Sequence, residues 1–330
     1  MKAITYRAFG AARDVLQVED LESPTPGPGE VLVDVAFSGV NPSDVKARAG
    51  ARPGVTKPPY PVIVPHSDGS GVISAVGDGV PEGRIGERVW IWNGQWQRPF
   101  GTAAEQIALR SEQAVRLPDS VSLETGAVLG IPGLTACHTV FSGDDIAGQT
   151  VLVQGGAGTV GYLAVQLVKW GGARVIATAG SGSLNRVRSA GADIALDYTT
   201  PDLAEQILDA NNGQPVHRIV EVEFGRNAET DAAVITENGR INAYGSAKAT
   251  TPPLPFYPLM FKSVTLEMVL IYLQPPEIRN QTIAQLTCAL KEGALDCPIQ
   301  SVYDLSNTAA AHEEVEAGGR TGAVLIRTGS

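Results

Sequence analysis

The chain has 330 residues, of which 43% are hydrophobic and 18% charged, and its formal net charge is −10. This composition is typical of a folded globular protein, and the length exceeds the roughly 250–300 residues at which one core usually divides, so we expect two domains. The negative charge argues against nucleic acid as a partner, and no apolar run approaches the ~18 residues of a membrane span, which excludes a membrane protein.

The opening segment, "MKAITYRAFG", has neither the apolar stretch nor the small-residue cleavage site of a secretory signal. The three cysteines, Cys137, Cys288 and Cys297, are odd in number, widely spaced and without a CxxC pair. Cysteines of this kind are typical of reduced thiols in a cytosolic protein. We therefore expect a cytoplasmic protein.

Residues 1 to 120 contain short β-rich runs separated by glycine and proline, such as "EVLVDVAF", "GVISAVG" and "RVWIW". This spacing predicts an antiparallel β domain of barrel or sandwich type. Beyond about residue 120, predicted strands alternate with predicted helices, and this alternation favours a doubly wound parallel sheet of α/β class. The predicted strands cover residues 150–154, 174–179, 193–198, 217–224 and 240–246.

The C-terminal part contains a helical segment at 276–293 and a closing strand at 323–328. A terminal strand needs a sheet to join, and the first domain offers one, so the nucleotide-type domain would be an insertion. We therefore expect a β-rich domain of residues 1–122 and 266–330 around a dinucleotide-binding domain of residues 123–265. The apolar segment 263–272 is either an edge strand that pairs with its twin in a homodimer or an ordinary buried strand.

A glycine motif, Gly156-x-Gly158-x-x-Gly161, lies between a predicted strand and a predicted helix. We expect Gly156 to form the tight turn, Gly158 to let the backbone approach a pyrophosphate, and Gly161 to let the helix pack on the strand. The helix N-terminus would offer unpaired N–H groups to the phosphates. Because strand, loop, helix and second strand follow in order, the motif predicts dinucleotide binding.

The residues after the second strand distinguish the two nicotinamide dinucleotides. An NAD site usually has an acidic residue about 20 positions past the loop, and this chain has none between Ala157 and Ala192. Gly180, Ser181, Arg186 and Arg188 are available instead, and a 2′-phosphate needs such donors and positive charge. The sequence therefore favours NADPH, although the two arginines are also compatible with a solvated helix face.

Several longer stretches carry a family resemblance, among them "SGVNPSD" (38–44), "HSDGSGVISAVGDGV" (66–80), "LGIPGLTA" (129–136), "VLVQGGAGTVG" (151–161) and "AHEEVEAGGRTGAVLI" (311–326). With these, the chain resembles the medium-chain dehydrogenase/reductase superfamily, and within it the zinc-free, zeta-crystallin-like NADPH:quinone oxidoreductases. The resemblance implies a GroES-like β-rich catalytic domain and a Rossmann domain.

Zinc-binding members of the superfamily have ligands at three places where this chain differs. It has Asn41 and Ile131 where cysteines would stand, and Pro-His-Ser at 65–67 in place of Gly-His-Glu. A catalytic zinc needs three protein ligands, and His66 alone cannot hold the ion. We expect no metal, and we expect His66 to be a polar wall residue or to bond a backbone carbonyl.

The resemblance implies NADPH-dependent, zinc-independent reduction of quinones by hydride transfer in an interdomain cleft. Without a Lewis acid, reducing an acceptor that delocalises charge is easier than oxidising a plain alcohol. Two alternatives stay open: reduction of α,β-unsaturated aldehydes or ketones, and a cofactor-binding protein with little catalysis.

The resemblance also implies a set of site residues. Asn41, Lys46 and Thr135 form the candidate catalytic set, and Asn41 and Thr135 also border the nicotinamide. The remaining candidates are Ala157, Gly158, Thr159 and Val160 at the pyrophosphate, Gly180, Ser181 and Arg186 at the 2′-phosphate, Tyr198 at the adenosine, and Gly245, Ser246, Val269, Leu270 and Ile271 flanking the nicotinamide. The alternative for Asn41 is a turn residue before a proline, and we favour a functional role over it. Thr135 and Tyr198 are equally compatible with core or helix-surface positions.

Two features differ from the family or have no assigned role in it. Lys46 stands where the family pattern has a tyrosine, and it would bind a phosphate, donate a proton or simply lie on the surface. The segment "WIWNGQWQRPFG" (90–101) is rich in aromatic residues. It predicts either a wall that stacks planar acceptors or a cluster at the barrel rim with one ring exposed.

Overall fold

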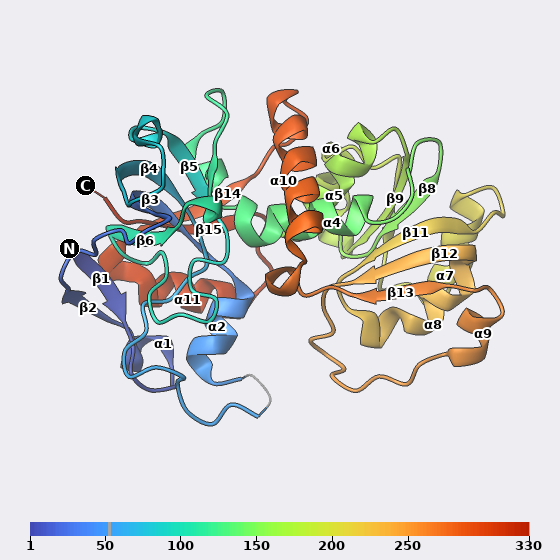
Figure 1. The fold of residues 1–330 in the computed structure, drawn as a ribbon. Coiled ribbons are helices and arrows are strands. Elements are labelled where there is room, and N and C mark those ends of the chain that lie inside the picture. Colours follow the sequence, from blue (N-terminus) through green and yellow to red (C-terminus); the bar gives the residue numbers. More distant parts are fainter. Residues whose placement is uncertain (52–53, 330) are drawn as a thin grey trace. The chain divides into compact units, whose positions relative to one another are not determined.

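The computed structural model describes residues 1–51 and 54–329, and the chain forms two compact units (Figure 1). Unit 1 contains Met1–Ile131 and the segment from Cys297 onward, and unit 2 contains Pro132–Asp296. Unit 2 is therefore inserted into the sequence of unit 1. Among the described residues, no helix has the length and apolar character needed to cross a bilayer.

Unit 1 is built on a seven-stranded sheet in the order β14-β15-β3-β4-β5-β7, with β6 also paired to β3. Its closing strand β15 runs antiparallel to β3, so the C-terminal strand joins the sheet of the first domain, the candidate that the sequence offered. The strands of this sheet are β3 (Glu30–Val40), β4 (Asp68–Val76), β5 (Arg88–Ile91), β6 (Gln106–Arg110), β7 (Ala114–Arg116), β14 (Ile299–Asp304) and β15 (Ala323–Arg327). Strands β1 (Lys2–Thr5) and β2 (Gln17–Asp20) form a separate antiparallel pair. The helices are α1 (Ala12–Val15), α2 (Pro42–Ala49), α3 (Leu123–Gly126) and α11 (Thr308–Ala317).

The alternation along β3 explains how this sheet forms its core. Val31, Val33 and Val35 are at most 3% exposed and belong to one apolar cluster, together with Ile73 of β4 and Ile107 of β6. Successive side chains of a strand point to opposite faces, so a period of two places these valines on the same face. The antiparallel β domain expected from the first 120 residues is confirmed.

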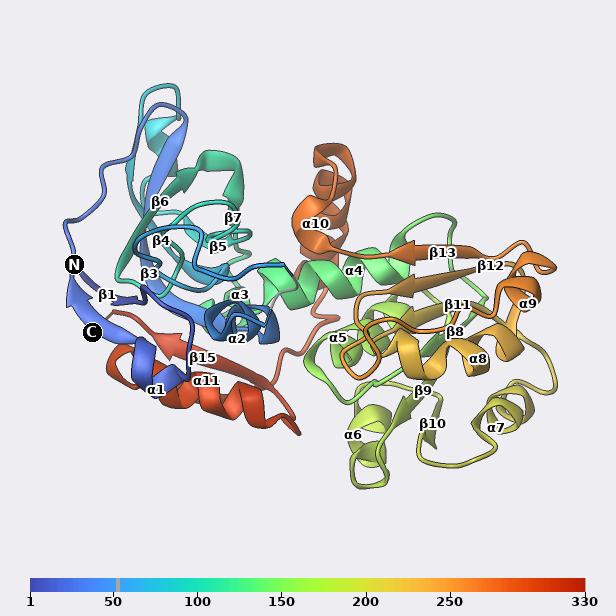
Figure 2. The same cartoon turned by 90° about the horizontal axis from the view of Figure 1, so that it is seen from below.

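Unit 2 contains a six-stranded parallel sheet in the order β10-β9-β8-β11-β12-β13, which Figure 2 shows strand by strand. The chain leaves the central strand β8 in one direction through β9 and β10, and then returns to add β11, β12 and β13 on the other side. The strands are β8 (Thr150–Val153), β9 (Arg174–Ala179), β10 (Ile194–Asp197), β11 (Val216–Glu221), β12 (Ile235–Ala243) and β13 (Thr265–Met268). This is the doubly wound order, in which ligands bind where the strand order reverses.

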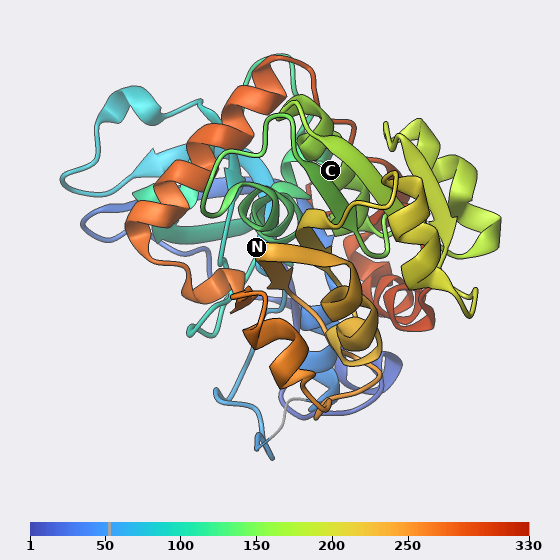
Figure 3. The ribbon, with the colours of Figure 1, turned by 90° about the vertical axis from the view of Figure 1, so that its right-hand side faces the viewer.

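The helices of unit 2 are α4 (Leu134–Phe141), α5 (Thr159–Trp170), α6 (Leu184–Ser189), α7 (Leu203–Ala210), α8 (Phe224–Val234), α9 (Phe256–Met260) and α10 (Pro276–Lys291). Helices α7 and α8 pack on the sheet through an apolar cluster that includes Leu203, Ile207 and Phe224. Helix α4 packs against α5 and α10, and α10 lies beside α4 in Figures 1 and 3.

Two expected boundaries were wrong. Residues 123–131, which we had assigned to the dinucleotide-binding domain, belong to unit 1. Residues 266–296 belong to unit 2, whereas we had assigned them to the β-rich domain. The reason is strand pairing: β13 hydrogen-bonds in parallel to β12, with Ile241 opposite Leu266, and α10 then packs on α4. The chain returns to unit 1 only at Cys297.

Candidate functional site

The glycine loop connects β8 to α5 through a turn at Gly155. Gly155 has a φ of +70°, a left-handed conformation that favours glycine. Our expectation that Gly156 forms the tight turn was therefore wrong; a Cβ on Gly156 would lie 3.1 Å from the Cβ of Ala177, so this glycine permits close packing instead. A Cβ on Gly161 would lie 2.3 Å from the Gly155 carbonyl oxygen, which explains the glycine in the first turn of α5.

The N-terminus of α5 lies in the segment expected to hold the pyrophosphate. Gly158 precedes the first helical residue, Thr159, and a Cβ there would meet only the Gly155 oxygen, at 3.6 Å. The space next to Gly158 is open, as a phosphate that contacts the backbone requires. The structure therefore brings Ala157, Gly158, Thr159 and Val160 together at one helix end.

A buried hydrogen-bond network extends from this loop. The Gly155 N–H donates to Thr178 Oγ1 (3.1 Å), and Thr178 in turn donates to Gln154 Oε1 (2.7 Å). Gln154 Nε2 donates to Asp231 Oδ1 (3.1 Å). Thr178 and Gln154 are each 1% exposed. The hydrogen bonds that link the loop to the interior of unit 2 are therefore shielded from water.

The network ends at two buried carboxyl groups, Glu221 at the end of β11 and Asp231 on α8. Burial raises the pKa of Glu221 to about 7, and burial together with the nearby Glu221 charge raises the pKa of Asp231 well above its usual range. Glu221 also accepts hydrogen bonds from Asn227 Nδ2 (3.0 Å) and from the Glu223 N–H. We infer that the pair retains a proton at neutral pH, because two adjacent buried carboxylates cannot both ionise without a large cost. We had not predicted this pair; the one signal in the sequence is an acidic residue within the apolar run that ends β11.

The residues that we expect at the 2′-phosphate and the adenosine follow β9 and β10. A Cβ on Gly180 would lie 3.3 Å from the Tyr198 hydroxyl oxygen, so these two residues are neighbours. Tyr198 is 53% exposed, and its backbone N–H donates to the Ala179 carbonyl (3.1 Å). Ser181, which follows Gly180, is also exposed. The structure thus brings Gly180, Ser181 and Tyr198 to one edge of the sheet.

Arg186 contacts the glycine loop. Its Nε donates to the Ala157 carbonyl (3.1 Å), and its guanidinium lies 4.2 Å from the ring centroid of Tyr162. Arg186 Nη2 is buried and has no hydrogen-bond partner among residues 1–51 and 54–329. Arg188, in contrast, is exposed and donates to Asn185 Oδ1 (2.9 Å), so the interpretation as a solvated helix face holds for Arg188 only. An unpartnered guanidinium nitrogen next to the loop fits a phosphate oxygen.

The candidates expected beside the nicotinamide lie at the ends of β12 and β13. Ser246 Oγ accepts from the Gly225 N–H (3.0 Å), so its hydroxyl connects this loop to the start of α8. A Cβ on Gly245 would lie 2.3 Å from the Val222 carbonyl oxygen, which accounts for the glycine. The Val269 N–H donates to the Ala243 carbonyl (2.8 Å) and extends the strand pairing.

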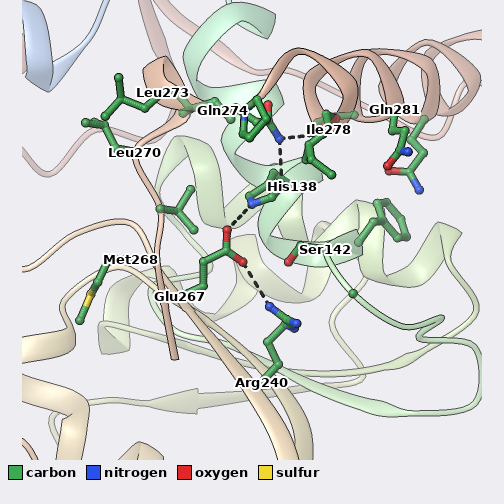
Figure 4. A pocket seen from close by; sticks show the side chains of 17 residues that line it. His138, Ser142, Arg240, Glu267, Met268, Leu270, Leu273, Gln274, Ile278 and Gln281 are labelled. Carbon is green, nitrogen blue, oxygen red and sulfur yellow. Dashed lines mark hydrogen bonds and ion pairs between the residues drawn. The ribbon is translucent and has the colours of Figure 1, made fainter. Parts of the chain in front are cut away.

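Val269, Leu270 and Ile271 also line a cavity of about 600 Å³ formed with α4, β12 and α10 (Figure 4). A chain of polar side chains crosses it, and Figure 4 shows their order, Gln274, His138, Glu267 and Arg240. Gln274 Nε2 lies 2.9 Å from His138 Nδ1, His138 Nε2 lies 2.6 Å from Glu267 Oε1, and Arg240 Nη1 lies 3.3 Å from Glu267 Oε2. Because an amide N–H only donates, Nδ1 of His138 accepts and Nε2 carries the proton given to Glu267. The sequence analysis had not identified these four residues.

Asn41 is the N-cap of α2 in unit 1 and is 7% exposed. Its Nδ2 donates to Asp68 Oδ2 (2.8 Å), and its backbone N–H donates to Asp44 Oδ2 (2.8 Å). Burial, followed by the Asp44 charge, raises the pKa of Asp68 well above its usual range. Asn41 is therefore held in one orientation, as a group that positions a substrate must be.

Lys46 and Thr135, the other candidate catalytic residues, differ in exposure. Lys46 lies on the exposed side of α2 and forms no ion pair among the described residues, which favours a surface lysine. Thr135 lies in α4 of unit 2 and is 5% exposed. The catalytic role of both residues stays a prediction.

His66 is completely buried, and both of its ring nitrogens are hydrogen-bonded. Nδ1 lies 2.8 Å from Ser38 Oγ, and Nε2 lies 2.8 Å from Nε2 of His312. Burial lowers the pKa of both rings, that of His312 to about 3, so the pair is neutral. Its partners are side chains, so the backbone carbonyl, one of the two alternatives that we expected for His66, is not its partner. Within the described part of the chain, no group of three His, Cys, Asp or Glu side chains is arranged to hold a metal ion.

The aromatic segment 90–101 contains one fully buried ring and one clearly exposed ring. Trp90 is 0% exposed, whereas Phe100 is 44% exposed. Trp92 Nε1 donates to the Glu112 carbonyl (3.1 Å). This arrangement favours the rim cluster over a wall of stacked rings.

Two family models match the chain: an alcohol dehydrogenase GroES-like domain over residues 27–119 and a zinc-binding dehydrogenase over residues 159–287. The mouse quinone oxidoreductase is 30% identical over 335 residues, which cover 99% of this chain and 97% of the mouse protein. The rat quinone oxidoreductase is 28% identical over 331 residues, with 99% and 97% covered.

Two solved structures are similar over their whole length. One is an NAD-dependent alcohol dehydrogenase, with a TM-score of 0.86, 29% identity and 100% of each chain covered. The other is a mycobacterial protein complexed with NADPH, with a TM-score of 0.85, 27% identity, and 99% of this chain and 100% of that chain covered. The predicted combination of a GroES-like domain with a Rossmann domain is confirmed.

Proposed function

Since the chain belongs to the quinone oxidoreductase family of the medium-chain dehydrogenase/reductase superfamily, we propose that it reduces quinones with NADPH and without zinc. The observation that carries this proposal is the arrangement around the glycine loop. The loop offers a helix N-terminus for a pyrophosphate, no acidic residue stands between Ala157 and Ala192, and Arg186 retains a buried, unpartnered nitrogen. These features suit a phosphorylated ribose better than a free 2′-hydroxyl.

NADPH, when bound, supplies the hydride, and the residues of the chain hold it in place. Backbone N–H groups of Gly158 to Val160 would bind the pyrophosphate, and Arg186 would bind an anionic oxygen beside the loop. The buried network from Gly155 to Asp231 holds the turn of this loop in one conformation.

In unit 1, Asn41 is the candidate for orienting the reacting groups, because its amide is fixed by Asp68. Hydride and one proton convert a quinone into a quinol, and the acceptor delocalises the incoming charge. His66 is proposed to be structural, since Ser38 and His312 occupy its two nitrogens.

A panel of acceptors tests the proposed activity. Oxidation of NADPH, followed at 340 nm, is expected with 1,4-benzoquinone and 9,10-phenanthrenequinone. Faster turnover of α,β-unsaturated aldehydes or ketones would favour the second reductase reaction. Tight NADPH binding with no turnover of any acceptor would favour a binding protein and contradict the proposal.

We further propose a homodimer formed through β13, the last strand of the unit 2 sheet. Met268 on this strand is 65% exposed, and Leu270 and Leu273 just beyond it are 50% and 62% exposed. An edge strand with apolar neighbours suits pairing with its twin across a two-fold axis. Gel filtration at several concentrations should give twice the chain mass, and replacement of Met268 with Lys should shift the elution toward the monomer.

We also propose that the protein resides in the cytoplasm. The three cysteines are thiols, and Cys137 is buried. Burial raises the pKa of Cys137, so this thiol stays protonated and unreactive. Fractionation of cells that express the protein would test the location.

A further inference from the structure

A second cavity, of about 430 Å³, lies within unit 1. The residues that line it are Met1, residues 21–25, Val64, Arg98, Phe100, Gly101, Ala104 and residues 106–108 of strand β6. Ligand-binding cavities typically measure roughly 300–1,000 Å³. Nothing in the proposed quinone reduction uses this cavity.

The floor of the cavity is apolar and its rim is polar. Val64, Ala104, Ile107 and Ala108 are at most 8% exposed. Glu22, Ser23 and Thr25, which also line the cavity, are exposed to solvent. A cavity with this division accepts a ligand with an apolar body, because burial of its hydrocarbon surface provides the driving force.

Arg98 is the unusual residue of this lining. It is half-buried, and the hydrogen bond of its guanidinium is from Nη2 to the Ala108 carbonyl (2.7 Å). It forms no ion pair in the described part of the chain, 1–51 and 54–329. The charge of the Glu30 carboxylate attracts Arg98. That carboxylate, however, accepts a hydrogen bond from the Gly27 N–H (3.0 Å) and forms no ion pair with Arg98. Charged groups removed from water are normally paired, so a cation in this position lacks an anion.

We propose that this cavity is a binding site for a small amphipathic carboxylate, whose carboxylate pairs with Arg98 and whose hydrocarbon part covers the floor of the cavity. A planar guanidinium binds a carboxylate through two parallel hydrogen bonds, and Arg98 has donors left after its bond to Ala108. The carboxylate of Glu22 at the rim disfavours ligands with a second negative charge near the solvent side. A monocarboxylate with a short alkyl or aryl body therefore fits best.

Octanoate is a suitable probe, with 1-octanol and octylamine as neutral and cationic analogues. The protein should carry no N-terminal tag, because Met1 lines the cavity. Calorimetric titration should give saturable octanoate binding with a dissociation constant on the order of 1 mM or below. A hydrogen bond to a charged group contributes enough that 1-octanol should bind roughly 10- to 100-fold more weakly, and octylamine should show no saturable binding.

Arg98→Gln should weaken octanoate binding by a similar factor of roughly 10 to 100 and leave 1-octanol binding unchanged. Arg110→Gln is the matched control, because Arg110, at the end of β6, has 78% of its side chain exposed and does not line the cavity. Equal binding of octanoate and 1-octanol, equal octanoate binding by the Arg98→Gln protein, or no saturable octanoate binding would overturn the proposal. The comparison of the three probes on the unaltered chain decides the question even if the Arg98 variant does not fold. Neither result depends on quinone turnover.

Discussion

Replacement of Glu221 with Gln is expected to stabilise the protein at neutral and alkaline pH. Glu221 and Asp231 are both completely buried, and burial raises the pKa of each. The amide of Gln is close in size to the carboxyl group. It retains an acceptor for Asn227 and gains a donor for Asp231, so the hydrogen bonds are kept while one potential charge is removed.

The size of the effect follows from the pKa of Glu221, which rises from 4.5 to about 7 on folding. A group with a raised pKa binds its proton more tightly in the folded state. Its contribution to stability is complete below pH 4.5 and is lost as the pH rises through about 7. The difference between these two values corresponds to about 3 kcal/mol. The unaltered protein should therefore lose up to about 3 kcal/mol between pH 5 and 8 from this group, and the Gln variant should not.

Urea unfolding at pH 5, 6, 7 and 8, followed by tryptophan fluorescence, measures this difference. The stability of the Glu221→Gln variant relative to the unaltered protein should rise steadily over this range. Glu205→Gln, on the exposed side of α7, is the control and should shift stability equally at every pH. Parallel curves for the Glu221 variant and the unaltered protein would refute the reasoning, because they would mean that Glu221 ionises normally in the folded state.

Three further substitutions address the candidate site. Asn41→Ala removes the amide that Asp68 holds, and kcat/KM for 1,4-benzoquinone should fall by roughly 10- to 100-fold, with a cooperative unfolding transition well above the assay temperature excluding misfolding. Lys46→Ala should change kcat/KM by less than about twofold, because an exposed lysine without an ion pair contributes little; a tenfold loss would place it in the reaction. Arg186→Met should weaken NADPH binding by roughly tenfold in a calorimetric titration and NADH binding by less, whereas equal losses would assign Arg186 to loop stability alone.

The two large sheets could be predicted because each has a periodic pattern in the sequence. The alternation of β3 and the strand–helix alternation after residue 120 are local signals. The assignment of 266–296 failed because an apolar segment predicts a strand but not its partner, and β13 pairs with β12 rather than with the first sheet. The strand expected at 240–246 begins earlier, because β12 starts at Ile235. The residues that follow Ile235 are polar and show no alternating pattern, so this first part of the strand has no signal in the sequence.

The part of the candidate site that could be predicted is the part formed by residues close together in the sequence. The glycine motif placed the loop between a strand and a helix, but it gave the tight turn to Gly156, whereas the residue with positive φ is Gly155. The other contacts depend on packing between distant segments. His66 meets His312 across 246 positions, and Asp231 meets the network only because α8 packs on β11. No local pattern encodes such contacts.

The most direct test of the central claim is the ratio of kcat/KM for NADPH to that for NADH. It should be measured with 1,4-benzoquinone after dialysis against a chelator, alongside the metal content of the same sample. The account predicts a clear preference for NADPH and full activity in protein that contains no zinc. A preference for NADH, or activity that disappears with the metal and returns with added zinc, would contradict it.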